Sequence, residues 1–373
     1  QRDHARHHRA QTARRPMTAP VLFEVANGWG VATLNRGDAL NALTLEMIRL
    51  LRPQLAAWAA DPAIKAVMIE GAGDRAFCAG GDVVAIYHAI QEERRSGVAS
   101  PLTRDFFFEE YQLNAAIAGF PKPYVALLHG ITMGGGVGLS AGASHRIVGP
   151  GYLFAMPETG IGLFPDVGGG WYLPQLAAGF GDYLALTGAR VGAGDAMALG
   201  LASDFVAAAD WAAMRAALRA CAWDGEPDVD IDRVLAPFRG APPAGRLAVD
   251  PAAVAALFAE TDFSALWARI QAGGDPLTED LRQTLAGKSP TSLRVSHEQL
   301  KRGARMASIE EVLTMEYRLS QHSMAGHDFS EGVRALLVDK DKSPNWRPAS
   351  VEMVSDSLVE SFFAPTGARE LTW

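Results

Sequence analysis

The chain has 373 residues, of which 49% are hydrophobic and 20% charged, and its formal net charge is −8. This acidic balance argues against a protein that binds nucleic acid, because such proteins present basic surfaces to the phosphates. No apolar stretch reaches the roughly 20 residues of a membrane-spanning helix, so we expect no membrane partner. Two cysteines, Cys78 and Cys221, provide neither a disulfide framework nor a metal-ligand cluster, so we expect a reducing, cytoplasmic location and no bound metal.

The first predicted elements follow a polar leader. Residues 1–16 are rich in arginine and lack the apolar stretch of a secretory signal, and we expect a disordered leader or an expression remnant there. Residues 21–25 and 30–34 predict two strands, which turn at Asn27-Gly28 to form a hairpin.

The next segments alternate helices and strands. Residues 44–60 predict a helix, because their apolar side chains recur with helical spacing. The runs 66–71 and 124–130 predict buried strands, and each leads straight into a glycine-rich turn. Such alternation is typical of an α/β fold, so we predict one α/β core over residues 17–225.

The composition changes at residues 224–251, which are rich in proline, glycine and aspartate. We interpret this segment as a connection between two units. Beyond it the pattern predicts helices, and Ser289-Pro290 supplies an N-cap and a first-turn proline for one of them. We therefore predict a mainly helical C-terminal region over residues 226–373.

Two glycine-rich turns, "AFCAGGD" (76–82) and "HGITMGGGVGL" (129–139), follow predicted strands. Glycines let a backbone pass close to a ligand, and N–H groups at the start of a helix bind negative charge. Two such turns can supply the two donors of an oxyanion hole, which stabilise a developing negative oxygen. The alternative is that both are tight packing turns. We interpret His129 as a structural hydrogen-bonding residue.

Residues 154–170, "FAMPETGIGLFPDVGGG", contain Glu158 and Asp166, the only charged side chains between Arg146 and Asp182. A carboxylate among apolar neighbours is costly unless it is solvated, paired or used in chemistry. The pair is therefore a candidate for acid–base or nucleophilic catalysis. The alternative is that both carboxylates cap turns in a solvated loop.

The segment "GLSAG" (138–142) matches the motif G-x-S-x-G, which places a nucleophilic serine on a sharp turn directly after a strand. Here the predicted strand ends near Gly130, ten residues before Ser140. We therefore expect Ser140 to be a small packing residue inside a helix.

Together these segments resemble the crotonase (enoyl-CoA hydratase/isomerase) superfamily, and within it the 3-hydroxyisobutyryl-CoA hydrolase branch. The resemblance extends through "SPTSL" (289–293), "EVLTMEYRLSQ" (311–321) and residues 326–346. It implies a crotonase-type spiral of ββα units followed by C-terminal helices. It also implies hydrolysis of an acyl-CoA thioester, with 3-hydroxyisobutyryl-CoA of valine degradation as the substrate. No separate cofactor is expected, because coenzyme A is part of the substrate, and a homo-oligomer is left open.

The resemblance also implies the roles of individual residues. The oxyanion N–H groups correspond to Gly81 and Gly135. Glu158 corresponds to the catalytic carboxylate, acting as a nucleophile that forms an anhydride or as a general base for water. Asp166 corresponds to an acidic residue of the hydrolases that shares substrate positioning and proton handling. Glu110, in "FFFEEYQLN", corresponds to their additional substrate-binding glutamate.

Arg36 and Ala79 are the remaining implied substrate contacts. Asp38, in "LNRGDALNAL" (34–43), stands where relatives carry a lysine near the coenzyme A phosphates, so those contacts are the weakest part of the comparison. Gly138 stands where hydratases carry a glutamate, which favours a hydrolase over the alternative, a hydratase or isomerase of the same superfamily. A non-catalytic scaffold is the other alternative, but the acidic residues whose loss would mark it are present.

Overall fold

The computed structural model describes residues 19–367 and 369–373, so the predicted leader at 1–16 lies outside the described residues. Its strands form a six-stranded sheet in the order β1-β2-β3-β5-β7-β9 and a three-stranded sheet in the order β4-β6-β8. β1 and β2 run antiparallel, and the other neighbouring strands run parallel. The strands are β1 (Val21–Ala26), β2 (Trp29–Leu34), β3 (Ala66–Gly71), β4 (Ala76–Cys78), β5 (Tyr124–Leu128), β6 (Ile131–Met133), β7 (His145–Val148), β8 (Leu153–Ala155) and β9 (Asp204–Phe205).

From β3 to β8, strands that follow one another in the chain belong alternately to the larger and the smaller sheet. β3, β5 and β7 belong to the larger sheet, and each is followed directly by a strand of the smaller sheet, β4, β6 and β8. Helices separate these pairs, so the chain repeats two strands and a helical segment while it advances along both sheets. The predicted α/β fold class is confirmed.

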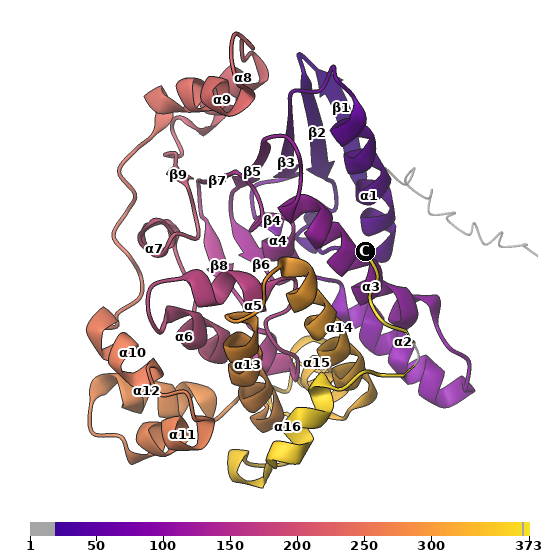
Figure 1. The fold of residues 1–373 in the computed structure, drawn as a ribbon, viewed down its shortest axis with the longest axis vertical. Coiled ribbons are helices and arrows are strands. Elements are labelled where there is room, and N and C mark those ends of the chain that lie inside the picture. Colours follow the sequence, from indigo (N-terminus) through magenta and orange to yellow (C-terminus); the bar gives the residue numbers. More distant parts are fainter. Residues whose placement is uncertain (1–18, 368) are drawn as a thin grey trace, which may run out of the picture.

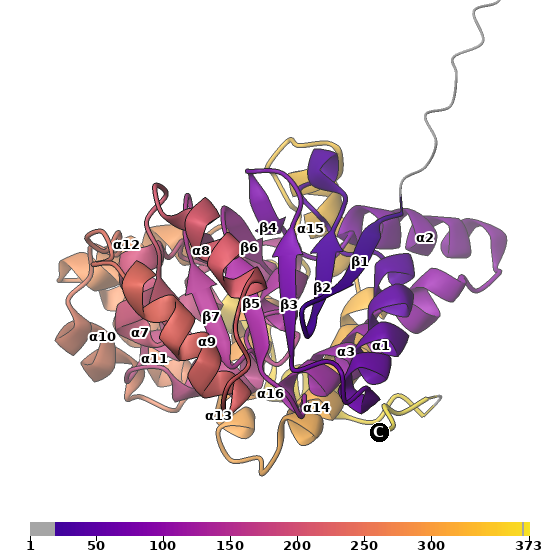
Figure 2. The same cartoon turned by 90° about the horizontal axis from the view of Figure 1, so that it is seen from above.

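Helices cover both faces of the larger sheet, and alternate side chains of its inner strands point to opposite faces, whereas most side chains of the edge strand β1 are exposed. One face is covered by α8 (Trp211–Arg219) and α9 (Pro227–Leu235), and α1 (Leu45–Ala60) packs on the other (Figures 1 and 2). The apolar residues buried between the sheet and these two helices are Trp29, Val31, Ala66, Met68, Val125, Leu127, Ile147, Val206, Met214, Leu218, Ile231 and Leu235. Burial on both faces explains why β3 and β5 are apolar throughout most of their length.

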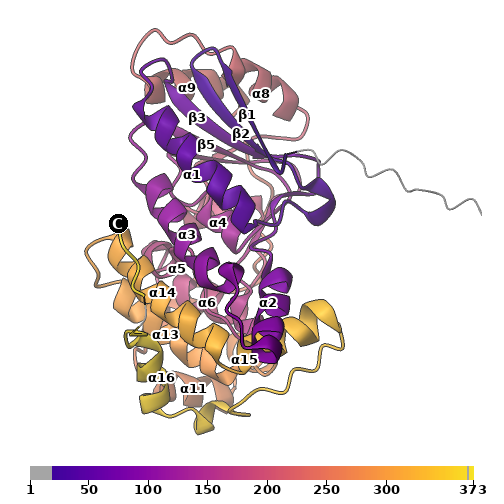
Figure 3. The ribbon, with the colours of Figure 1, turned by 90° about the vertical axis from the view of Figure 1, so that its right-hand side faces the viewer.

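The helices from α10 onward lie at the opposite end of the molecule from α8 and α9 (Figures 1 and 3). α14 packs against α3, and α13 packs against α5 and α6. The predicted helix start at Ser289-Pro290 is confirmed, since Ser289 caps α13. Within the described residues, no helix is long and apolar enough to cross a membrane. The remaining helices are α2 (Val83–Ser96), α3 (Pro101–Ala118), α4 (Gly135–Gly138), α5 (Gly169–Tyr172), α6 (Phe180–Thr187), α7 (Ala193–Leu199), α10 (Pro251–Phe258), α11 (Phe263–Ala272), α12 (Pro276–Leu285), α13 (Pro290–Gly303), α14 (Ile309–Ala325), α15 (Asp328–Val333) and α16 (Asp356–Phe363).

The N-terminal predictions agree with the structure. The hairpin of β1 and β2 is confirmed, and Asn27 and Gly28 have the positive φ angles, 48° and 76°, that a tight hairpin turn requires. The predicted first helix is α1, which begins after its N-cap Thr44. β5 ends at Leu128, two residues before the predicted end of that strand.

The prediction that residues 224–251 only connect two units is wrong in its early part, which forms α9. Pro227 stands in the first turn of α9, and Ile231 and Leu235 are buried against the larger sheet. Proline and aspartate suit the start of a helix as well as a linker, because both are favoured in a first turn. The division of the chain near residue 225 stays a prediction, and by its contacts α9 belongs with the sheet.

Candidate active site

One cavity of about 290 Å³ collects six of the seven predicted site residues. It is enclosed by the two glycine-rich turns, by α3, and by residues 157–166. The turns meet because β4 and β6, which lead into them, are neighbours in the smaller sheet. The six predicted residues in the lining are Ala79, Gly81, Glu110, Gly135, Glu158 and Asp166.

The backbones of Gly81 and Gly135 lie close together in this cavity. A Cβ added at Gly135 would be 3.2 Å from the Gly81 nitrogen. Among the described residues, neither N–H group donates a hydrogen bond. Side chains are excluded nearby, since a Cβ at Gly136 would lie 2.3 Å from the Cys78 oxygen and Gly134 has a φ of 47°. Two free N–H groups with no side chain between them are what an oxyanion hole requires.

Three buried carboxyl groups face the same cavity. Glu110, Glu158 and Asp166 are 1%, 5% and 4% exposed. Glu158 Oε2 and Glu110 Oε1 have no hydrogen-bond partner among the described residues. Asp166 Oδ2 accepts a hydrogen bond of 2.8 Å from the hydroxyl of Tyr111. Because unpaired buried carboxyl oxygens are costly, they indicate a place for a ligand.

Burial raises the pKa of each of these carboxyl groups. The second cause of the raised pKa of Glu158 is the negative charge of Asp166. For Glu110, the charges of Asp166 and Glu158 add to the effect of burial. Burial raises the pKa of Asp166 to about 7, although the hydrogen bond from Tyr111 acts in the other direction. Like charges at short range oppose joint ionisation, so the cluster retains protons near neutral pH. This is the condition for exchanging protons with a substrate.

Helix α3 directs Glu110 into the cavity and its neighbour Glu109 away from it. Glu109 forms an ion pair with Arg49 of α1 at 2.7 Å. Tyr111, also on α3, was not identified from the sequence. The available signal was that a buried tyrosine hydroxyl needs a partner, but that partner, Asp166, lies 55 positions away in the sequence.

Arg36 lies outside the cavity lining. Its Nη1 donates to the Ala42 oxygen at 2.5 Å, and its Nη2 lies 3.4 Å from Asp82 Oδ2. Asp82 also caps α2, so Arg36 braces the residue next to Gly81. Its predicted contact with the substrate stays a prediction.

The apolar wall of the cavity was also missed by sequence reasoning. Phe106 and Phe107 come from α3, and Leu336 and Leu337 come from the short π-helix η5 (Arg334–Val338) in the C-terminal region. Leu337 is 38% exposed and therefore lies where the cavity meets solvent. No local pattern links these residues, because helix packing alone brings η5 to the cavity.

Gly138, which the resemblance aligns with a glutamate of hydratases, is closely packed in this fold. A Cβ at Gly138 would lie 2.6 Å from both Asn114 Nδ2 and Val167 Cβ. A longer side chain therefore does not fit at this position without displacing both neighbours.

Ser140 does not act as an exposed nucleophile. Its Oγ donates to the Gly136 oxygen at 2.8 Å, and the side chain is 3% exposed. The prediction that Ser140 lies inside a helix is wrong in extent, since the glycine-rich α4 ends at Gly138. Glycine has low helix propensity, which accounts for the short helix. His129 lies outside the candidate site and lines a separate cavity with Trp211.

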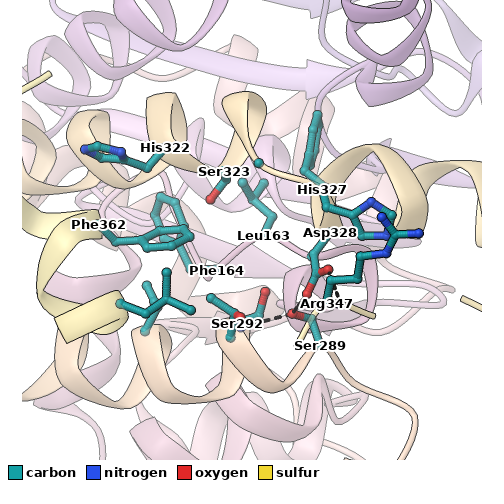
Figure 4. Close-up of a pocket in the computed structure, with 16 residues that line it drawn as sticks. Leu163, Phe164, Ser289, Ser292, His322, Ser323, His327, Asp328, Arg347 and Phe362 are labelled. Carbon is teal, nitrogen blue, oxygen red and sulfur yellow. Dashed lines mark hydrogen bonds between the residues drawn. The ribbon is translucent and has the colours of Figure 1, made fainter. Parts of the chain in front are cut away.

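A neighbouring cavity of about 170 Å³ lies among α13, α14, α15 and α16 (Figure 4). It shares Leu163 with the first cavity. Figure 4 shows Ser289 and Asp328 facing each other, and Ser289 Oγ donates to Asp328 Oδ2 at 2.6 Å. Asp328 Oδ1 also accepts from the Arg347 nitrogen at 2.8 Å. These hydrogen bonds hold the helices together, so we interpret the cavity as a seam between them.

Comparisons with known proteins agree on one family. A family model described as "Enoyl-CoA hydratase/isomerase" matches residues 29–363. The chain is 45% identical to the mitochondrial 3-hydroxyisobutyryl-CoA hydrolase of Xenopus laevis, covering 94% of this chain and 90% of that protein. It is 41% identical to the human mitochondrial enzyme of the same name, covering 98% and 94%.

Two solved structures are also similar. A carnitinyl-CoA dehydratase from Mycobacterium thermoresistibile has a TM-score of 0.86 at 38% identity, covering 95% of this chain and 99% of that one. An enoyl-CoA hydratase from Rhodobacter sphaeroides has a TM-score of 0.84 at 40% identity, covering 95% and 100%. The names of these relatives differ in reaction but share an acyl-CoA group.

The expected cytoplasmic location is contradicted by these findings, because the named hydrolase relatives are mitochondrial proteins. The expectation depended on Cys78 and Cys221, which are both free and buried. Free thiols indicate a reducing rather than an oxidising compartment, but they do not indicate which reducing compartment it is.

Proposed function

The chain belongs to the enoyl-CoA hydratase/isomerase (crotonase) family, and from that premise we propose that it hydrolyses acyl-CoA thioesters, with 3-hydroxyisobutyryl-CoA as the substrate. The crotonase-type fold, a spiral of ββα units followed by helices, is confirmed by the solved relatives. The observation that carries the proposal is the unpartnered, buried Glu158 oxygen in the same cavity as two free N–H groups. The names of the hydrolase relatives support the choice of reaction.

The proposed reaction uses groups of the chain alone. The thioester oxygen accepts hydrogen bonds from the N–H groups of Gly81 and Gly135, which stabilise it as it becomes negative. Glu158 attacks the carbonyl carbon to form an anhydride, which water then opens, or it removes a proton from an attacking water. The C–S bond breaks as the carbonyl re-forms, and the coenzyme A thiolate takes up a proton. Asp166, held by Tyr111, shares protons with Glu158.

A short 3-hydroxyacyl group suits the lining of the cavity. The apolar wall formed by Phe106 and Leu336 accommodates a methyl branch. Glu110 and Asp166 supply oxygens that accept a hydrogen bond from the substrate hydroxyl. Coenzyme A is the thiol part of the proposed thioester substrate, so the proposal includes no separate cofactor. In valine degradation the enzyme would release 3-hydroxyisobutyrate.

The test compares hydrolysis with hydration in one preparation. We expect free thiol from 3-hydroxyisobutyryl-CoA, followed colorimetrically, and little loss of the enoyl absorbance of crotonyl-CoA. Isobutyryl-CoA, which lacks the hydroxyl group, is the matched control and should react more slowly, because the carboxyl oxygens then lose their partner. Fast loss of enoyl absorbance without thiol release would identify a hydratase of the same family instead.

The rate is expected to rise with pH through the neutral range. Glu158 is active as a base or nucleophile only when ionised, and its pKa is raised by burial and then by the charge of Asp166. Asp166→Asn removes that charge, so the pKa of Glu158 should fall and the acid limb should move to lower pH. The measurement is kcat/KM over about pH 5–9 for both enzymes. An acid limb that stays in place or moves to higher pH would contradict the assignment.

A further inference from the structure

A strained turn carries Asp166 into the cavity. Val167 follows Asp166 with a φ of 54°, in the left-handed region that β-branched residues rarely adopt, and Gly168 has a φ of 90°. Val167 is 1% exposed, so the strain lies in a packed part of the molecule. Such a backbone conformation persists only where the surrounding structure holds it.

The holding contacts come from two C-terminal helices. Glu316 of α14 accepts from the Gly168 nitrogen through Oε2 at 2.8 Å and from the Gly170 nitrogen through Oε1 at 2.9 Å. Gln299 of α13 donates from Nε2 to Glu316 Oε1 at 2.9 Å and to the Pro165 oxygen at 2.7 Å. The two side chains therefore bind the backbone on both sides of the strained residue.

The chemistry of this contact is specific to a carboxylate. Glu316 and Gln299 are both 0% exposed. Among the described residues, every hydrogen-bond partner of the Glu316 carboxyl group is an N–H donor, so the group serves as an acceptor only. Burial raises the pKa of Glu316 to about 8, whereas the hydrogen bonds from Gly168 and Gly170 favour the ionised form, so the carboxylate predominates above about pH 8. A buried charge is costly compared with an apolar side chain of similar size, so this one calls for a role besides packing.

We propose that Glu316 and Gln299 are positioning residues, which hold the strained turn so that Asp166 faces the substrate. The catalytic part of this inference rests on the proposed function. Neither side chain lines the cavity, so both act through the turn. Loosening the turn should slow the chemical step more than it weakens substrate binding, because Glu110 and the oxyanion N–H groups remain in place.

The first test is Glu316→Gln, which keeps the shape of the side chain. The new amide has one acceptor oxygen, and its NH₂ group faces a backbone N–H, so one of the two contacts to the turn is lost. We expect kcat to fall by about 10–100-fold with KM changed less. The fall should persist at the high-pH plateau of the profile, which separates misplacement from a change in ionisation. Glu310→Gln, on the same helix, is the matched control and should retain wild-type kcat, because among the described residues the Glu310 carboxylate makes no hydrogen bond to the turn.

A double-mutant cycle tests whether Glu316 acts through Asp166. In an Asp166→Asn background, Glu316→Gln should lower kcat by less than about twofold, because the group to be positioned is already lost. If the two effects multiply instead, the positioning role is overturned. Wild-type kcat in Glu316→Gln would also overturn it, while hydrolysis by the wild-type enzyme would leave the proposed function intact.

Amide hydrogen exchange tests the hold on the turn without any substrate. At least one of the Gly168 and Gly170 amides should exchange at least about 10-fold faster in Glu316→Gln, and both should exchange at the wild-type rate in Glu310→Gln. Unchanged exchange would overturn the proposal. If the wild-type protein fails to hydrolyse the thioester while exchange accelerates as expected, the proposed function fails and the hold on the turn stands. If circular dichroism shows that Glu316→Gln is unfolded, Gln299→Met, which removes the donor amide at similar length, takes its place in the same measurements.

Discussion

The Glu158→Gln enzyme is expected to release coenzyme A from 3-hydroxyisobutyryl-CoA about 10²–10⁴ times more slowly than the wild-type enzyme. The amide can neither attack the thioester carbonyl nor take a proton from water. The substitution keeps the size of the side chain, and it replaces a carboxyl group whose pKa is raised by burial, so the fold should tolerate it. The measurement is thiol release at saturating substrate, with circular dichroism to confirm the fold.

The control for this prediction is Glu109→Gln. Glu109 neighbours a cavity residue in sequence, but its carboxylate pairs with Arg49 away from the cavity. We expect that enzyme to keep nearly the full rate, because the carboxylate lies away from the cavity and an amide of the same size can still accept a hydrogen bond from Arg49. The Glu158→Gln enzyme should still bind the substrate, and calorimetry can measure this binding because the variant turns the substrate over so slowly. A Glu158→Gln enzyme with wild-type turnover would remove Glu158 from the mechanism.

Gly135→Pro is expected to lower kcat by about 10²–10³-fold, equivalent to about 2.7–4 kcal/mol of transition-state stabilisation. Proline has no N–H group, so one of the two donors to the thioester oxygen is lost. Gly135 is the first residue of α4, a position where proline is tolerated in helices. The pyrrolidine ring would also crowd Glu110, since a Cβ at this position lies 2.8 Å from Glu110 Oε1.

Gly135→Ala separates the two effects of that substitution. Alanine adds the same Cβ but keeps the N–H group, so the difference between the two variants reports the lost donor. Both enzymes must first show a native circular dichroism spectrum. Equal rates in the alanine and proline variants would place the oxyanion donors elsewhere in the cavity.

Much of the fold and part of the candidate site follow from local rules of sequence. The hairpin at Asn27-Gly28, the first helix and the buried strands were predictable, because turn residues and apolar periodicity depend on near neighbours in the chain. Glu158 and Asp166 stand out as charges in an apolar segment. The glycine-rich turns stand out because several glycines follow a strand. None of these signals needs knowledge of distant contacts.

Other features depended on tertiary structure. Residues 224–251 look like a linker by composition, yet α9 forms there because Ile231 and Leu235 find an apolar sheet face to cover. Tyr111 and Leu336 became recognisable as site residues only once their elements were docked on the cavity.

The same limit applies to Glu316, which lies 148 positions from the Gly168 backbone that it binds. The sequence by itself determined which groups can carry the chemistry, since charge, glycine content and periodicity are properties of short segments. The tertiary structure decided which of these groups meet, which neighbours shift their pKa values and what holds the strained turn. The physical reason is that an apolar helix face specifies burial but not its partner, so the docking of α13, α14 and η5 depends on packing across the whole molecule.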